Sequence, residues 1–166
     1  MILVRLCNLT VDLNKLPTNL FKILNLLTDT LKVLKRIGMK HKQKILIVED
    51  DIDILSVMTM SLKDEGYEVE GTLNGDETIT RTEKFKPDLV IMDVYLSGTN
   101  GKEICKKLKT DKKTKYIPVI LISASTQIRS TVKECGADGF INKPFDNADL
   151  LYGVTNFLPQ YTQMAR

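Results

Sequence analysis

The chain has 166 residues, of which 43% are hydrophobic and 27% are charged, which is typical of one globular domain with a short additional segment. It contains no uninterrupted apolar run of about 18 residues and no basic start followed by a cleavage site, so we expect neither a membrane-spanning helix nor a signal peptide. The net charge of +3 comes from the first 43 residues, which hold eight Lys and Arg against two Asp. The remainder is acidic, and we therefore do not expect the main domain to bind nucleic acid directly.

Cysteine and histidine usage narrows the chemistry further. The three cysteines, Cys7, Cys105 and Cys135, are widely spaced and lack metal-ligand spacing. We interpret them as reduced thiols of a cytoplasmic protein. The single histidine, His41, precedes the main domain, which argues against a histidine-assisted nucleophilic hydrolase.

Residues 1–42 are expected to form an N-terminal extension. Leucines recur there at alternating spacings of four and three, with polar residues on the opposite side, which predicts an amphipathic helix over about 18–37. We expect this helix to pack on the domain or to be poorly ordered, and a coiled coil or a membrane-surface contact is the alternative. A further alternative is that translation begins at Met39, which would make the preceding residues an artefact of the assigned start.

Residues 43–160 alternate between short apolar runs and stretches with helical periodicity, and residues 161–166 form a short tail. Three of the apolar runs are nearly continuous, as expected of strands covered on both faces. Five strands alternating with five helices predict an α/β domain with an open parallel sheet. The predicted strands are 44–48, 67–71, 88–92, 117–122 and 139–142, and the predicted helices are 52–65, 75–85, 101–110, 126–135 and 147–158.

The residues between these elements agree with the predicted boundaries. Asp51 and Asn74 are suited to cap the first and second helices of the domain. Gly66 and Gly136 stand just past helix ends, and Pro87 prevents continuation of the second helix.

Polar residues follow the strands of this predicted sheet, where ligands of open parallel sheets bind. Clustered carboxylates repel one another unless a cation joins them, and an all-oxygen ligand set fits Mg²⁺. Such an ion would neutralise an incoming phosphoryl group and hold it in line with a carboxylate nucleophile, while an ammonium and a hydroxyl would bind its oxygens. The residues concerned are Glu49, Asp50, Asp93, Ser123 and Lys143.

Four segments at these strand ends resemble one known family. KILIVEDD, PDLVIMDVYLSGTNG, VILISA and GFINKPF, in this order and spacing, resemble the receiver domains of two-component response regulators. The resemblance covers about residues 43–160. It implies a flavodoxin-like, doubly wound sheet of five parallel strands in the order 2-1-3-4-5 with five helices, and a histidine kinase or phosphotransfer protein as phosphoryl donor.

The resemblance also implies a role for each matching position. Asp93 corresponds to the phosphoacceptor, Ser123 to the switch hydroxyl, Phe140 to the switch aromatic, and Lys143 to a lysine that precedes a cis Pro144. The implied magnesium ligands are Glu49, Asp50, Asp93 and the backbone carbonyl of Tyr95, with Asp50 the more direct ligand of the acidic pair. Asp51 is better explained as a helix cap.

Three positions depart from the usual pattern of the family. Serine stands at 123 where threonine is commoner, and phenylalanine stands at 140 where tyrosine is commoner. Ser97 replaces a usual proline, which predicts a less rigid loop after Asp93. None of these departures removes a chemical group from the phosphorylation site.

The predicted function is that of a stand-alone, phospho-accepting receiver, because only eight residues follow the last predicted helix. It would catalyse only its own phosphorylation and dephosphorylation, and no other reaction. The output would be a contact with a downstream protein through the fourth helix, fifth strand and fifth helix, about residues 126–158, and a weak homodimer stays open.

Two other classes of function share the fold. A pseudo-receiver would use the same surface without phosphoryl turnover, against which the complete set of site residues argues. A flavin-binding protein would need a phosphate loop after the first strand, where Glu49, Asp50 and Asp51 would repel the phosphate.

Overall fold

The structure, a computed structural model, describes residues 3–6, 9–12 and 42–158. The chain divides into two units, residues 1–41 and residues 42–166, and each is described by itself. In the first unit, β1 (Leu3–Leu6) pairs with β2 (Leu9–Asp12) as an antiparallel hairpin, which the sequence analysis did not predict.

The amphipathic helix predicted over about 18–37 lies outside the described residues, as does Cys7. Within the part of the chain that the structure describes, no helix is both long and apolar enough to cross a membrane.

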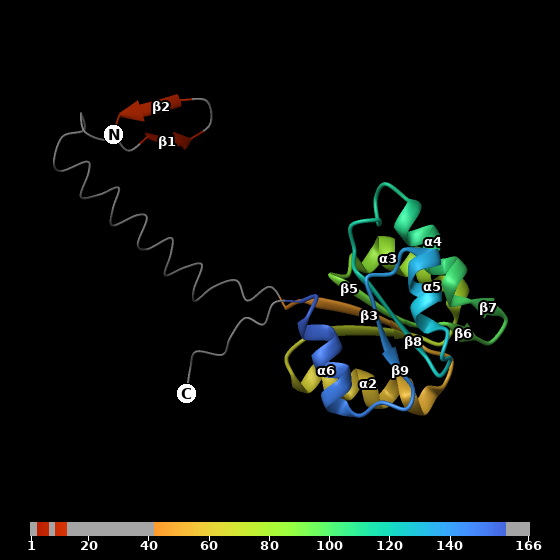
Figure 1. Cartoon of the computed structure of the whole chain (residues 1–166). Helices are drawn as coiled ribbons and strands as arrows, with labels where there is room; N and C mark the ends of the chain where they lie inside the picture. Colours follow the sequence, from red (N-terminus) through yellow and green to blue (C-terminus); the bar gives the residue numbers. More distant parts are fainter. Residues whose placement is uncertain (1–2, 7–8, 13–41, 159–166) are drawn as a thin grey trace. The chain divides into compact units, whose positions relative to one another are not determined.

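A five-stranded parallel sheet forms the centre of the second unit (Figure 1). Its strands lie in the order β4-β3-β5-β8-β9, which confirms the predicted order 2-1-3-4-5. The two most hydrophobic runs, β5 and β8, are buried along their whole length, as expected of strands covered on both faces. The strands are β3 (Lys44–Val48), β4 (Glu68–Thr72), β5 (Leu89–Asp93), β8 (Val119–Ser123) and β9 (Gly139–Asn142).

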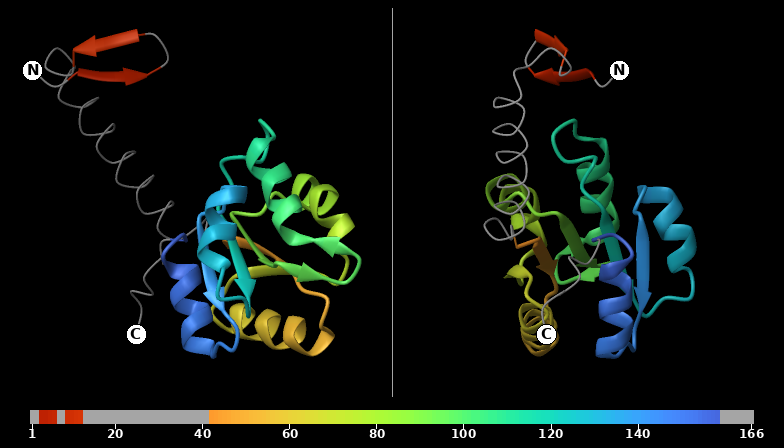
Figure 2. Two further views of the ribbon diagram at one scale, coloured as in Figure 1. Left: turned by 45° about the vertical axis from the view of Figure 1, so that its right-hand side comes forward. Right: turned by 90° about the vertical axis from the view of Figure 1, so that its left-hand side faces the viewer.

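Among the described residues, five helices cover the two faces of this sheet (Figures 1 and 2). Alternate residues of each strand point to opposite faces, so that β3 contributes Ile45 and Ile47 to one core and Leu46 and Val48 to the other. Fully burying an aliphatic side chain of this size contributes about 1.5–3 kcal/mol. The first core is covered by α2 (Ile52–Asp64) and α6 (Asn147–Thr155), and the second by α3 (Thr78–Phe85), α4 (Gly101–Thr110) and α5 (Ile128–Cys135).

The predicted helix caps are confirmed. The Asp51 side chain accepts hydrogen bonds from the backbone N–H groups of Asp53 and Ile54 at the start of α2. Asn74 caps a 3₁₀ turn, η2 (Gly75–Glu77), so the helix predicted from residue 75 is α-helical only from residue 78. Gly136 ends α5 with a φ of 77°, a backbone conformation that glycine adopts readily.

Some predicted element boundaries were wrong by one to three residues. Strand β8 begins at residue 119 rather than 117, because the Ile117 N–H is bonded to the Thr114 carbonyl and Pro118 has no N–H. The last helix ends at residue 155 rather than 158, and the N–H groups of Phe157 and Leu158 both donate to the Val154 carbonyl in the turn that follows.

A short hairpin between β5 and α4 was also missed. Strand β6 (Tyr95–Leu96) pairs antiparallel with β7 (Thr99–Asn100), and Leu96 is buried in the second core. The two strands are joined by Ser97 and Gly98, of which Gly98 has a φ of 79°. A Ser-Gly pair marks a tight turn, but strands of two residues are too short to show a period in sequence.

Candidate functional site

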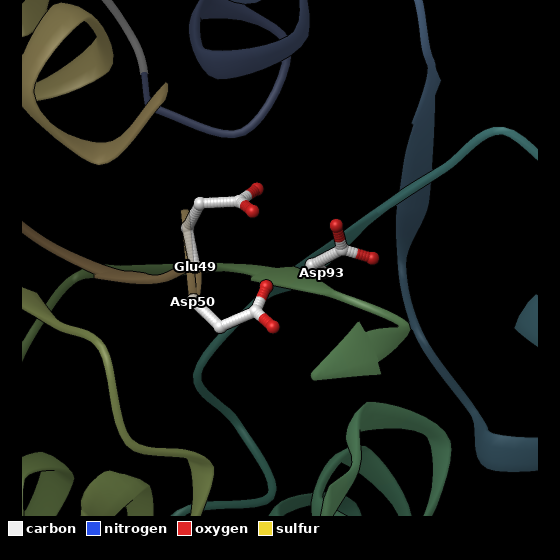
Figure 3. A group of neighbouring side chains, drawn as sticks. All are labelled: Glu49, Asp50 and Asp93. Atoms are coloured by element: carbon white, nitrogen blue, oxygen red, sulfur yellow. The ribbon is translucent and has the colours of Figure 1, made fainter. Parts of the chain in front are cut away.

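Three carboxylates meet at the carboxyl edge of the sheet (Figure 3). Strands β3 and β5 are neighbours in register, with Val48 opposite Met92, so the residues that follow them come together. One carboxylate oxygen each of Glu49, Asp50 and Asp93 lies within 4.8 Å of the others. Glu49 is only 1% exposed and Asp93 only 5%, whereas Asp50 is half-buried. Such close and buried charges are unfavourable without a compensating cation.

Lys143 supplies part of that compensation from the end of β9. Its ammonium donates to Glu49 Oε2 at 2.8 Å and to Asp93 Oδ2. Burial lowers the pKa of Lys143, but the hydrogen bonds to Asp93 and Glu49 outweigh it and leave this pKa raised. Burial raises the pKa of Glu49, and the contact with Lys143 opposes that rise. The peptide bond between Lys143 and Pro144 is cis, as the resemblance implied.

Asp50 is held from the opposite side by the β6–β7 hairpin. Its Oδ2 accepts hydrogen bonds from the backbone N–H of Ser97 at 2.9 Å and from the Ser97 hydroxyl at 2.6 Å. The hydroxyl contact is the main reason that the pKa of Asp50 is lowered. The lower rigidity predicted from serine in place of proline stays a prediction, and the hydrogen bonds from Ser97 to Asp50 tie the loop to the end of β3.

Two backbone groups fix the position of Asp93. The N–H of Tyr95 donates to Asp93 Oδ1 at 2.8 Å, while the Tyr95 ring is exposed. Gly101, the first residue of α4, packs directly against this backbone, and a Cβ there would lie 2.1 Å from the Asp93 carbonyl oxygen. No role was predicted for Gly101 from the sequence, and the available signal was a glycine at a predicted helix start, at the end of the second of the four quoted segments.

Ser123 and Phe140 lie on adjacent strands beside the carboxylates. Ser123 is the last residue of β8 and is 1% exposed, and its hydroxyl oxygen accepts a hydrogen bond from the Ser125 N–H at 3.1 Å. Phe140 in β9 is half-buried, and the Arg129 guanidinium lies 5.1 Å from its ring centroid. Phe140 and Lys143, two of the predicted functional residues, are both among the residues that line a cavity of about 350 Å³.

The donor set fits a small divalent cation. Three carboxylates and one ammonium leave a net charge of −2 when all four groups are ionised. All the candidate side-chain ligands are oxygen atoms, which favour a hard ion such as Mg²⁺ over the transition metals that prefer nitrogen or sulfur. A doubly charged ion at this position would balance the charge that Lys143 leaves uncompensated.

Comparison with known proteins gives a consistent result. The sequence model of the response regulator receiver domain family matches residues 45–155. The DNA-binding response regulator MtrA of Mycobacterium tuberculosis H37Rv is 33% identical over 115 residues, which cover 68% of this chain and 49% of MtrA. The phosphate regulon regulatory protein PhoB of Rhizobium meliloti is 34% identical over 117 residues, which cover 69% of this chain and 52% of PhoB. The chain thus spans about half the length of the curated relatives it matches.

Solved structures agree on the fold. The chemotaxis protein CheY4 of Vibrio cholerae is 30% identical, with a TM-score of 0.67 over 70% of this chain and 99% of that chain. The signal receiver domain of a histidine kinase from Syntrophus aciditrophicus is 32% identical, with a TM-score of 0.65 over 74% of this chain and 95% of that chain.

Proposed function

The chain belongs to the response regulator receiver domain family, and on this premise we propose that it accepts a phosphoryl group on Asp93. The observation that carries the proposal is the placement of a buried Asp93 carboxylate beside two further carboxylates and in contact with a lysine ammonium. We assign the receiver to residues 43–160, with 161–166 as a tail. The phosphoryl donor is a histidine kinase or a phosphotransfer protein.

The transfer is an in-line displacement at phosphorus. An Asp93 carboxylate oxygen forms the new P–O bond while the bond to the leaving group breaks, and the leaving atom takes that bond's electron pair. The Tyr95 N–H orients the Asp93 carboxylate through Oδ1. The Lys143 ammonium, which already contacts Asp93 Oδ2, moves to the transferred phosphoryl oxygens and balances their charge.

A magnesium ion is the proposed cofactor. Glu49, Asp50, Asp93 and the backbone carbonyl of Tyr95 would hold it. When bound, the ion supplies positive charge that neutralises the phosphoryl oxygens and lets them approach the acidic cluster. The net negative charge of the cluster and its all-oxygen donor set support this assignment.

Phosphorylation changes the protein's contacts through Ser123 and Phe140. The Ser123 hydroxyl donates a hydrogen bond to the phosphoryl group, and Phe140 moves into the space that Ser123 and its loop leave. The cavity lined by Phe140 and Lys143 supports this movement, because it gives the ring room beside the site. The altered face comprises α5, β9 and α6 and binds a downstream protein. MtrA is named a DNA-binding regulator, whereas for residues 43–160 of this chain we propose contact with protein and not with DNA.

Beryllofluoride, which mimics a phosphoryl group on a carboxylate, tests this function. With Mg²⁺ present, it should shift the amide resonances of Ser123, Phe140 and Lys143 in the ¹⁵N NMR spectrum of the full chain. Asp93→Asn should remove these shifts, whereas Asp88→Asn, which alters a carboxylate that accepts from the Lys44 N–H outside the site, should retain them. A spectrum that does not respond to beryllofluoride would favour the pseudo-receiver.

A further inference from the structure

Each of the three clustered carboxylates has a hydrogen-bonding partner that fixes its orientation. Lys143 bridges Glu49 and Asp93 from the β9 side. Asp50 instead takes two hydrogen bonds from one residue, Ser97, which lies 47 positions away in the sequence. The two halves of the cluster are therefore held by different elements.

The two Ser97 donors act on the same atom. The backbone N–H and the hydroxyl both reach Asp50 Oδ2, at 2.9 Å and 2.6 Å, so Oδ1 is engaged by neither. A short carboxylate side chain beside two buried carboxylates is repelled by them and would otherwise turn toward solvent. Charge-assisted hydrogen bonds of this length oppose that rotation.

The hairpin that carries Ser97 is itself anchored. Leu96 is buried in the second core, and the Thr99 hydroxyl donates to Asp76 Oδ1 at 3.3 Å. On the site side, Tyr95 donates its N–H to Asp93. Ser97 thus stands on a turn whose two strands are each tied to the rest of the domain.

Metal-binding carboxylates depend on such outer hydrogen bonds, because a ligand that is already oriented loses less conformational freedom when the ion binds. We propose that Ser97 is a positioning residue that holds the Asp50 carboxylate in the geometry required for divalent-cation binding. This inference rests on the proposed function and adds a residue to it that contacts neither the phosphoryl group nor the ion.

The measurement is the Mg²⁺ affinity of the full chain, determined by titration with Mg²⁺ in the absence of any phosphodonor and monitored by ¹⁵N NMR amide shifts. Ser97→Ala removes the hydroxyl donor and keeps the backbone N–H, and we expect it to weaken Mg²⁺ binding by about tenfold, the lower end for loss of an outer hydrogen bond. Ser97→Thr keeps both donors and should remain within about twofold of the parent, far from the tenfold expected for a lost donor. Ser130→Ala is the matched control, because it removes a serine hydroxyl that donates to a carboxylate oxygen outside the site, Glu134 Oε1, and it should also stay within that range.

Urea unfolding of each variant shows whether the hairpin remains in place. If Ser97 only closed the turn, Ser97→Ala would lower stability and leave Mg²⁺ affinity unchanged, and this result would overturn the inference. Tighter binding by Ser97→Ala would overturn it as well, because it would mean that Ser97 competes with the ion for Asp50. A parent chain that binds no Mg²⁺ at millimolar concentration would instead contradict the proposed function, and with it the inference.

Discussion

Lys143→Met is the substitution that tests the electrostatics of the site most sharply. Methionine keeps an unbranched apolar side chain of similar length but removes the ammonium that bridges Glu49 and Asp93. Two carboxylates with side-chain exposures of 2% and 7% would then lie beside Asp50 without the positive charge of Lys143. We expect the variant to fold with a lower free energy of unfolding when magnesium is removed.

The magnitude follows from the geometry. Two unit charges 2.8 Å apart attract by about 6 kcal/mol at an effective dielectric constant of about 20. Desolvation of the three charges offsets part of this attraction, and removing one partner of a buried pair costs about 3–5 kcal/mol in practice. Because the Lys143 side chain is 21% exposed, we expect the lower end of that range, about 3 kcal/mol.

Urea unfolding in EDTA, followed by far-ultraviolet circular dichroism, measures this difference. Lys113→Met is the control, since its ion pair with Glu83 at 3.4 Å is on the surface and should contribute less than about 1 kcal/mol. Added Mg²⁺ should stabilise Lys143→Met more than the parent, because the ion meets a more negative cluster. Equal unfolding midpoints for Lys143→Met and the parent in EDTA would refute the reasoning.

Two further predictions concern residues outside the charged cluster. Burial, and to a smaller extent the charge of Glu65, raises the pKa of the Tyr67 phenol. The stability linked to the protonated phenol is therefore fully present below the unfolded pKa of about 10. It is lost as the pH rises through the pKa of the folded protein. Tyr67→Phe should therefore lose less stability than the parent between about pH 9 and about pH 11, as checked by urea midpoints, and parallel losses in both proteins would contradict this. Gly101→Ala should destabilise the domain by about 1–3 kcal/mol, because the added Cβ would lie 2.1 Å from the Asp93 carbonyl oxygen. Thermal unfolding measures this loss, and an unchanged midpoint would show that α4 can shift without strain.

The sheet and most of the site could be predicted because they depend on local patterns. The short, continuous apolar runs of β5 and β8 favour strands covered on both faces. The carboxyl ends of parallel neighbours lie at one edge, so polar residues that directly follow them must converge. This rule was sufficient to bring together Glu49, Asp93 and Lys143, which lie up to 94 positions apart.

The features that were missed depend on contacts that no local pattern reports. Strands β6 and β7 have two residues each, below the length at which a period can be seen. The contact from Ser97 to Asp50 depends on how that hairpin folds back over the end of β3. Position 101 requires glycine because a Cβ there would collide with the Asp93 carbonyl oxygen across the turn. A single glycine in a sequence does not show which distant backbone atom lies against it.

Labelling by acetyl phosphate tests the central claim most directly. The account predicts that the full chain with Mg²⁺ takes up one phosphoryl group, which peptide mapping places on Asp93 and which hydroxylamine removes. EDTA should prevent the labelling, and Asp93→Asn should abolish it. Labelling of equal extent in Asp93→Asn, or on the parent in EDTA, would contradict the account.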